Sequence, residues 1–87
     1  MASEEEFSAA QARVKQLSKT PAPKQLLELY ALYKQATVGD VSGTRPGMID
    51  FKGRAKYDAW AERKGQSPEA CRTAYVGLVN ELVSSEG

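Results

Sequence analysis

The sequence predicts an all-α fold, a four-helix bundle with up-down-down-up topology and a long loop between its second and third helices. Apolar residues recur at helical spacing in four segments, and no segment shows sustained alternation of apolar and polar residues. The 87-residue chain is enough for one small domain and has no internal repeat. We therefore expect residues 1–87 to form a single folded unit.

The first predicted helix begins after Ser3, which can cap it, and Glu6 three residues later completes a capping box. Its apolar side chains then recur at helical spacing: Phe7, Ala10, Val14 and Leu17. The helix is expected to end before Pro21. Phe7 has no polar aromatic or cationic neighbour in this pattern, so we expect it in the core.

The second predicted helix carries Pro23 in its first turn and stops at Gly39, just past the periodic run. One stripe and its flank hold Leu26, Leu27, Leu29, Tyr30, Ala31, Tyr33 and Lys34. Spacing i, i+3, i+4 brings Tyr30, Tyr33 and Lys34 side by side. These three side chains can therefore make contact together, either with the protein core or with a ligand.

The third and fourth helices have equally local start and stop signals. Asp50 can cap a helix that runs to about Lys64 and closes at Gly65, and Ser67 followed by Pro68 starts the last one. The inward candidates of the third helix are Ala55, Ala59 and Trp60. Those of the fourth are Cys71, Ala74, Tyr75, Leu78 and Leu82. We expect Trp60 to be a core residue without polar neighbours and Cys71 to be an inert packing residue.

The connections predict the topology. The segment VGDVSGTRPGMI, residues 38–49, could span about 40 Å when extended, against about 23 Å for a fifteen-residue helix. The chain can therefore run back along the bundle, which permits the second and third helices to be parallel. A structureless loop of this length in so small a domain is often functional.

Composition excludes several classes of function. The chain has 12 basic and 11 acidic residues, one cysteine and no histidine. A near-neutral charge gives no long-range attraction to nucleic acid or anionic membranes. Without histidine we expect no zinc site, no other metal or cofactor, and no histidine-based catalytic triad. The acidic start MASEEEF is not a signal peptide and no apolar run approaches a membrane span. We expect a soluble, cytoplasmic protein.

The cationic and aromatic residues leave two interpretations open. Lys52, Arg54 and Lys56 crowd the first turns of the third helix, where they oppose the helix dipole, and a phosphate would benefit from them together with Lys34. Alternatively the lysines form a solvated face and the tyrosines are ordinary core aromatics. Tyrosine beside lysine can also stack a base and bind its phosphate. Spacing alone indicates a helical domain with a candidate nucleotide-phosphate site.

The runs LYKQATVGD, RPGM, DFKGRAKYDAW and KGQSPEA, the last followed by AY, closely resemble the acyl-CoA-binding protein family. The resemblance extends from Phe7 to Leu82. It implies an up-down-down-up four-helix bundle that binds medium- and long-chain fatty acyl-CoA esters with high affinity. Such a protein is a monomeric intracellular pool former and carrier, without catalytic activity, nucleic-acid binding or stable membrane association.

The resemblance also assigns ligand-binding residues: Lys15, Leu26, Leu27, Tyr30, Ala31, Leu32, Tyr33, Lys34, Lys56 and Tyr75. It places the nucleotide 3′-phosphate on Tyr30, Lys34 and Lys56. Tyr33 would lie against the adenine, and Tyr75 would complete the site from the last helix.

The remaining assigned residues divide into two groups. Lys15 matches a basic position near the nucleotide, and the four apolar residues comprise two lining an acyl groove, Leu26 and Leu27, and two within the binding segment, Ala31 and Leu32. Three features depart from the family pattern. Tyr57 stands where tryptophan is frequent, the ending ELVSSEG lacks the usual lysines, and Gly77 lies inside the fourth predicted helix.

Two alternatives belong to other functional classes. A helical interaction module could touch nucleic acid through a basic strip made of Lys52, Arg54 and Lys56, although near-neutral net charge argues against it. An enzyme acting on acyl thioesters would need a nucleophile and a base, and the sequence offers no such pair at plausible spacing.

Overall fold

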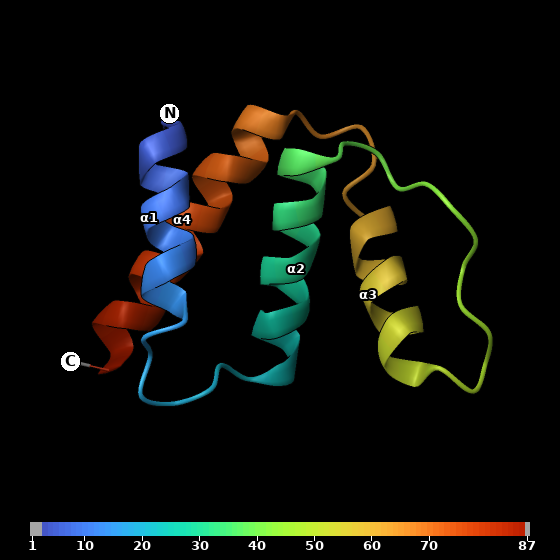
Figure 1. The fold of residues 1–87 in the computed structure, drawn as a ribbon, viewed down its shortest axis with the longest axis horizontal. Coiled ribbons are helices and arrows are strands. Elements are labelled where there is room, and N and C mark those ends of the chain that lie inside the picture. Colours follow the sequence, from blue (N-terminus) through green and yellow to red (C-terminus); the bar gives the residue numbers. More distant parts are fainter. Residues whose placement is uncertain (1–2, 87) are drawn as a thin grey trace.

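The computed structural model describes residues 3–86, which form four helices: α1 (Glu4–Val14), α2 (Pro23–Thr37), α3 (Phe51–Ala61) and α4 (Pro68–Glu86). In Figure 1, α1 and α4 run in one direction while α2 and α3 run in the other. The predicted all-α class and up-down-down-up topology are therefore confirmed. None of these helices is long and apolar enough to cross a lipid bilayer, as far as the described residues go.

The predicted helix starts are confirmed at three positions. The Ser3 hydroxyl accepts a hydrogen bond from the Glu6 amide at 3.1 Å, and the Ser3 amide donates to the Glu6 carboxylate at 3.2 Å. The Asp50 carboxylate accepts from the Gly53 amide at 2.9 Å. At the start of α4, the Ser67 hydroxyl accepts a hydrogen bond from the Ala70 amide at 3.0 Å. Each cap satisfies an amide that the first turn of a helix leaves without an intrahelical partner.

The glycines predicted to end helices have backbone conformations that other residues rarely adopt. Gly39 follows α2 with a φ of 97°, and Gly65 follows α3 with a φ of 89°. The α-helical part of α3 ends at Ala61, slightly before the expected Lys64, and turns continue to Gly65. The regular α-helix thus gives way to turns before Gly65 changes the direction of the chain, as is common at helix ends.

The first helix is shorter than its apolar pattern predicted. It ends at Val14, so Leu17 lies in the connection to α2 and not on the helix. Leu17 is half-buried there, where it lines a depression together with Gln25 of α2 and Leu82 of α4. The helical spacing of Leu17 therefore reflected burial in a loop, and this part of the prediction was wrong.

The core lies among α1, α2 and α4. Its buried side chains are Phe7, Ala10, Leu29, Leu32, Ala36, Cys71, Tyr75 and Val79. Val79 is fully buried although the predicted inward set of α4 omitted it, and Ala74 of that set is exposed. Phe7 and Cys71 occupy the core as predicted.

The third helix packs on the opposite side of α2, and among the described helices it contacts α2 alone. Its anchor is Trp60, which is buried and donates from its indole Nε1 to the Gly39 carbonyl at 2.8 Å. The loop between α2 and α3 is tied down as well. Arg45 forms a two-bond ion pair with Asp58 at 2.7 and 2.8 Å, and the Tyr57 hydroxyl donates to the Gly43 carbonyl at 3.2 Å.

Candidate functional site

Two open grooves flank α2. The first, which we call the tyrosine groove, has a volume of about 440 Å³ and lies between α2, α4 and the segment that follows α1. The second, the α2–α3 groove, has a volume of about 450 Å³. It is lined by Pro23, Leu26, Leu27, Phe51, Lys52, Ala55 and Lys56. Leu26 lines both grooves, so they form adjoining surfaces on either side of one helix.

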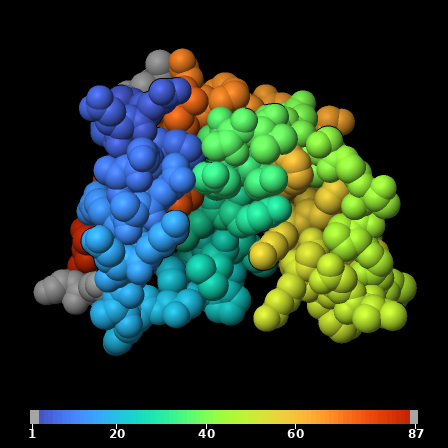
Figure 2. Space-filling view, in the orientation of Figure 1, coloured from blue at the N-terminus to red at the C-terminus, as the bar shows by residue number. Residues whose placement is uncertain are grey.

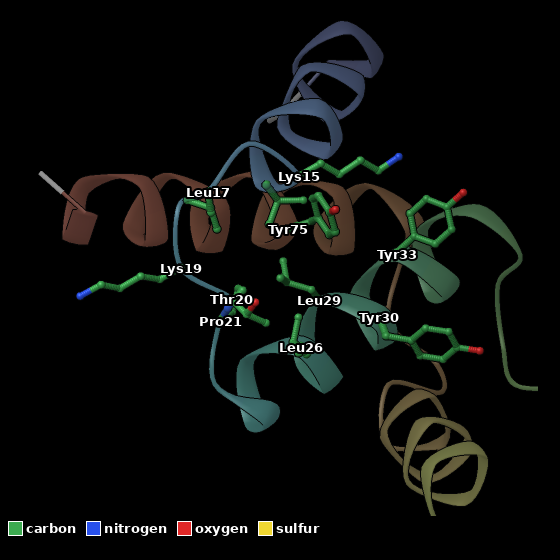
Figure 3. A pocket seen from close by; sticks show the side chains of 11 residues that line it. Lys15, Leu17, Lys19, Thr20, Pro21, Leu26, Leu29, Tyr30, Tyr33 and Tyr75 are labelled. Atoms are coloured by element: carbon green, nitrogen blue, oxygen red, sulfur yellow. The ribbon is translucent and has the colours of Figure 1, made fainter.

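The tyrosine groove contains most of the predicted aromatic residues. Tyr30, Tyr33 and Tyr75 all line it, together with Lys15. In Figure 3 the Lys15 ammonium and the Tyr30 and Tyr33 hydroxyls point to the same side, whereas the Lys19 ammonium points to the other. One end of the groove therefore gathers hydrogen-bond donors, which suits an anionic or nucleotide-like group.

The rings of this groove rest on the core. Phe7 packs edge-on against Tyr75 with ring centroids 5.1 Å apart, and stacks on Tyr33 at 6.1 Å. Tyr75 is 5% exposed, and its burial raises the pKa of its hydroxyl, with a smaller contribution from Tyr33. Tyr33 remains 38% exposed. The groove thus combines a fixed, neutral phenol at its base with an accessible aromatic ring at its rim.

Two lysines lie over aromatic rings at the junction of α2 and α3. The Lys34 ammonium is 4.8 Å from the centroid of the Trp60 ring, and the Lys56 ammonium is 5.4 Å from that of Tyr30. Such contacts hold a cation by the ring quadrupole without neutralising its charge. Neither lysine forms an ion pair with a carboxylate in the described part of the chain. Both charges remain available to an anion.

The environment of Trp60 differs from the prediction. Trp60 is buried, as expected for a core residue, but it has a cationic neighbour in Lys34 and a hydrogen bond to a backbone carbonyl. The expectation that it lacks polar neighbours was wrong. The contact joins residues on two different helices, and it depends on how those helices cross.

The predicted site residues divide into exposed and buried sets. Leu26 and Leu27 line the α2–α3 groove, where Leu26 is 43% exposed. Ala31 and Leu32 are 1% and 3% exposed, and neither lines either of the two grooves. The structure therefore brings eight of the ten predicted residues to the grooves or their junction, whereas Ala31 and Leu32 are buried outside both grooves.

The basic strip predicted as an alternative nucleic-acid contact does not form one surface. Lys52 and Lys56 are separated by four residues and both line the α2–α3 groove. Arg54 does not line it and is half-buried. Arg54 is two positions from both lysines, and side chains two positions apart on a helix point to nearly opposite sides. A duplex could not contact all three from one direction.

Sequence reasoning missed several lining residues. In the α2–α3 groove these are Pro23, Phe51 and Ala55, and in the tyrosine groove they are Val14, Leu17, Lys19, Thr20, Pro21 and Leu29. Leu17, Lys19 and Thr20 were hidden by the expectation of a longer first helix. Phe51 carried a usable signal, because a large aromatic residue next to a helix cap has no partner in the helical pattern.

The arrangement is suited to binding. The described residues contain no group of three acidic, cysteine or histidine side chains that could hold a metal ion. Burial raises the pKa of the Cys71 thiol, and Cys71 is 1% exposed. It is therefore a protonated, inaccessible thiol and a poor nucleophile.

Comparison with known proteins agrees with this geometry. The family model described as "Acyl CoA binding protein" matches residues 4–79. The chain is 49% identical over 81 residues to the acyl-CoA-binding protein homolog 1 of Caenorhabditis elegans, covering 93% of this chain and 94% of the relative. It is 48% identical over 80 residues to the homolog of Drosophila melanogaster, covering 92% and 93%. The crystal structure of acyl-CoA-binding protein 2 from Oryza sativa superposes with a TM-score of 0.90 at 40% identity, covering 94% and 89%.

Proposed function

This chain belongs to the acyl-CoA-binding protein family, and we propose that it binds one medium- or long-chain fatty acyl-CoA with high affinity. The family consists of non-catalytic binding proteins. The chain would act as a pool former and carrier that shields the thioester and does not cleave it. We also propose that it works as a cytoplasmic monomer.

The position of Lys56 carries this proposal. Lys56 lines the apolar α2–α3 groove and holds its ammonium 5.4 Å from the Tyr30 ring, at the border of the tyrosine groove. A fatty acyl-CoA has a charged nucleotide at one end and a hydrocarbon chain at the other. Lys56 and Tyr30 lie at the border of the two grooves, where the charged nucleotide of such a ligand would give way to its hydrocarbon chain.

The hydrocarbon chain is assigned to the α2–α3 groove, which is lined mostly by carbon. Leu26 and Phe51 are 43% and 78% exposed, so an acyl chain laid on them would remove apolar surface from water. Burial is worth about 0.8 kcal/mol per methylene, which gives a sixteen-carbon chain roughly 12 kcal/mol before association and ordering costs. Apolar burial therefore supplies most of the affinity.

The nucleotide is assigned to the donors around Tyr30. Lys34 and Lys56 would bind the 3′-phosphate with the Tyr30 hydroxyl, because both ammonium groups lie over rings and neither is ion-paired within the described residues. Tyr33 is accessible enough to lie against the adenine. Lys15 would contribute from the segment after α1, on the side to which these phenols point.

The three most buried of the assigned residues act by shape. Ala31 and Leu32 are buried residues of α2 that pack the helix in place, and Tyr75 supports the ring of Tyr33 at a centroid distance of 6.5 Å. The small Ala31 side chain also lies on the side of α2 that faces α3, where it lines a shallow depression with Ala55 and Ala59. We propose that these residues set the spacing of the grooves.

Calorimetry with CoA, octanoyl-CoA and palmitoyl-CoA, each below its micellar concentration, tests the proposal. Affinity should rise with acyl length by up to about 0.8 kcal/mol per buried methylene until the groove is full. The heat-capacity change should become more negative along the series. Equal affinities for the three ligands would reject the acyl groove, and tighter binding of an RNA oligomer would favour the nucleic-acid alternative.

Two substitutions sharpen the test. Leu26→Ala removes a groove side chain and should reduce the difference between palmitoyl-CoA and CoA. Val38→Ala removes a comparably exposed apolar side chain that lines neither groove, and should leave the difference unchanged. Thiol release from palmitoyl-CoA should stay at the uncatalysed rate in every variant, and sustained hydrolysis would contradict a carrier.

A further inference from the structure

Gln35 is the only buried polar or charged residue among those that the structure describes, with an exposed fraction of 1%. Its side-chain nitrogen makes two hydrogen bonds near the end of α2. Nε2 donates to Asp40 Oδ1 at 2.8 Å and to the Gln66 carbonyl at 3.0 Å. The Gly65 amide donates to the same Asp40 oxygen at 2.8 Å. We call Gln35, Asp40, Gly65 and Gln66 the Gln35 node.

The Gln35 node joins three parts of the chain. Gln35 belongs to α2, Asp40 to the start of the long loop, and Gly65 and Gln66 to the turn between α3 and α4. The Gln66 side chain also accepts a hydrogen bond from the buried Cys71 thiol of α4 at 3.4 Å. The node therefore fixes the point at which the chain leaves α3 relative to the end of α2.

A polar side chain at this buried position is costly. Gln35 Oε1 is buried and has no hydrogen-bond partner among the described residues. An apolar side chain of similar size would avoid the cost of burying that oxygen without a partner. It could not, however, direct hydrogen bonds to two fixed points, one on the loop and one on the turn. The contribution that only Gln35 makes here is therefore geometric.

The placement of α3 depends on the end of the helix that lies near the node. Among the described helices α3 contacts α2 alone. The two helices are parallel and end at the same edge of the molecule (Figure 1), where the Trp60 indole also donates to the Gly39 carbonyl. At the opposite edge, Figure 2 shows a hollow between the blue-green start of α2 and the yellow start of α3. The helices are thus joined at their ends and open at their starts.

The proposed phosphate site is divided between these two helices. Lys56 of α3 lies over the Tyr30 ring of α2 at 5.4 Å, and Lys34 of α2 lies over the Trp60 ring of α3 at 4.8 Å. A shift of α3 against α2 would change both distances. Gln35 follows Lys34 in the chain and lines neither groove, so any effect on the ligand must pass through other residues.

We propose that Gln35 is a positioning residue for the phosphate site. Its two hydrogen bonds hold the end of α3 against α2, and this placement sets Lys56 beside Tyr30. The same placement sets Trp60 beside Lys34. The inference rests on the proposed function, because it concerns the residues that would bind the 3′-phosphate.

The Gln35→Met variant tests the proposal, because it keeps a side chain of similar length and removes both hydrogen bonds. Calorimetry should show that its preference for CoA over dephospho-CoA is lower than that of the unchanged chain by roughly threefold or more. Its Trp60 emission without ligand should also shift, since the Lys34 contact changes. Val79→Ala weakens the core outside the node and is the control for stability. It should keep both the preference and the emission.

A double variant shows whether Gln35 acts through Lys56. Lys56→Ala should lower CoA affinity less in the Gln35→Met background than in the unchanged chain, because both changes disturb one contact. Additive losses would overturn the inference. Asp40→Ala removes an acceptor of the node at an exposed position, and it should reduce the same preference even if Gln35→Met does not fold.

The remaining outcomes separate this inference from the proposed function. If the folded node variants keep the full preference for CoA, the role of Gln35 is wrong and the phosphate site stands. Equal binding of CoA and dephospho-CoA by the unchanged chain would instead overturn the phosphate site of the proposed function.

Discussion

The Lys34 ammonium lies 4.8 Å from the ring centroid of Trp60, the only tryptophan in the chain. The Trp60 indole also donates to the Gly39 carbonyl, and the Gly39 amide donates to the Lys34 carbonyl at 3.2 Å. A cation–π contact and two hydrogen bonds therefore connect the Lys34 side chain, the Trp60 indole and the end of α2. We expect a displacement of the Lys34 ammonium to change the environment of the Trp60 indole.

Trp60 fluorescence should report nucleotide binding. A phosphate that draws the Lys34 ammonium away from the ring changes the electric field on the indole, so emission should shift or change in intensity on titration with CoA. Dephospho-CoA, which lacks the 3′-phosphate, should give a smaller response. Unaltered emission in a complex whose formation calorimetry has established would show that Lys34 does not move.

Removal of either ring-bound lysine should weaken coenzyme binding more than removal of an ordinary one. Hydrogen bonds to charged groups contribute about 1.5–3 kcal/mol, so Lys34→Ala and Lys56→Ala should each lower the affinity for CoA by roughly tenfold or more. Lys64→Ala removes an exposed lysine from the turn after α3 and is the control. The comparison is made by calorimetry, and equal losses in all three variants would reject the phosphate assignment.

Acid should weaken the fold through Asp40. Its carboxylate accepts hydrogen bonds from the Gly65 amide and the Gln35 side chain, both at 2.8 Å. The Gly65 hydrogen bond, followed by that from Gln35, lowers the pKa of Asp40 below its usual value of 3.8. Because the folded-state pKa is the lower one, this stabilisation is complete above about pH 4 and is lost as pH falls through the folded value.

The Asp40 contribution is measurable from the pH dependence of unfolding. Asp40→Asn should flatten the decline of the free energy of unfolding below about pH 4, relative to the unchanged chain. Glu81→Gln removes the same charge from an exposed position in α4 and controls for net charge. If the free energy of unfolding of Asp40→Asn declines as steeply below about pH 4 as that of the unchanged chain, other carboxylates cause the decline.

Gly77→Ala should stabilise the fold. Gly77 is exposed within α4, and a Cβ atom there would meet nothing within 4 Å. Alanine favours a helix interior over glycine by up to about 1 kcal/mol, partly by restricting the unfolded chain. Denaturant unfolding should therefore give a higher midpoint with an unchanged slope. A less stable variant would mean that the surroundings of α4 are more crowded than the structure indicates.

The parts of the fold that the sequence predicted correctly depend on neighbours in the chain. Ser3, Asp50 and Ser67 cap helices, and Gly39 and Gly65 end them, because these roles need only residues a few positions away. The length of the loop permitted the parallel course of α2 and α3, and the structure shows that course. Apolar periodicity then identified most of the core.

The errors concern contacts between distant segments. Leu17 continued the apolar pattern of α1 but is buried from a loop, since periodicity does not distinguish the two. Val79 was overlooked in favour of neighbouring leucines, because the buried face of a helix is fixed by where its partners lie. The Lys34–Trp60 contact depends on how α2 and α3 cross, and the exposure of Met48, Ile49 and Phe51 depends on the path of the loop. Composition and residue spacing do not determine the crossing of the helices or the path of the loop.

Among the helices that the structure describes, α3 contacts α2 alone, and we expect it to detach more easily than the other helices separate. Detaching α3 would break its packing on α2 and the loop bonds at Gly39 and Gly43, while the buried cluster of α1, α2 and α4 stayed closed. Amides of α3 should thus exchange with solvent hydrogen through a smaller opening than those around Val79. Because the proposed acyl groove lies between α2 and α3, we expect that detachment of α3 opens a route for the ligand to leave without global unfolding.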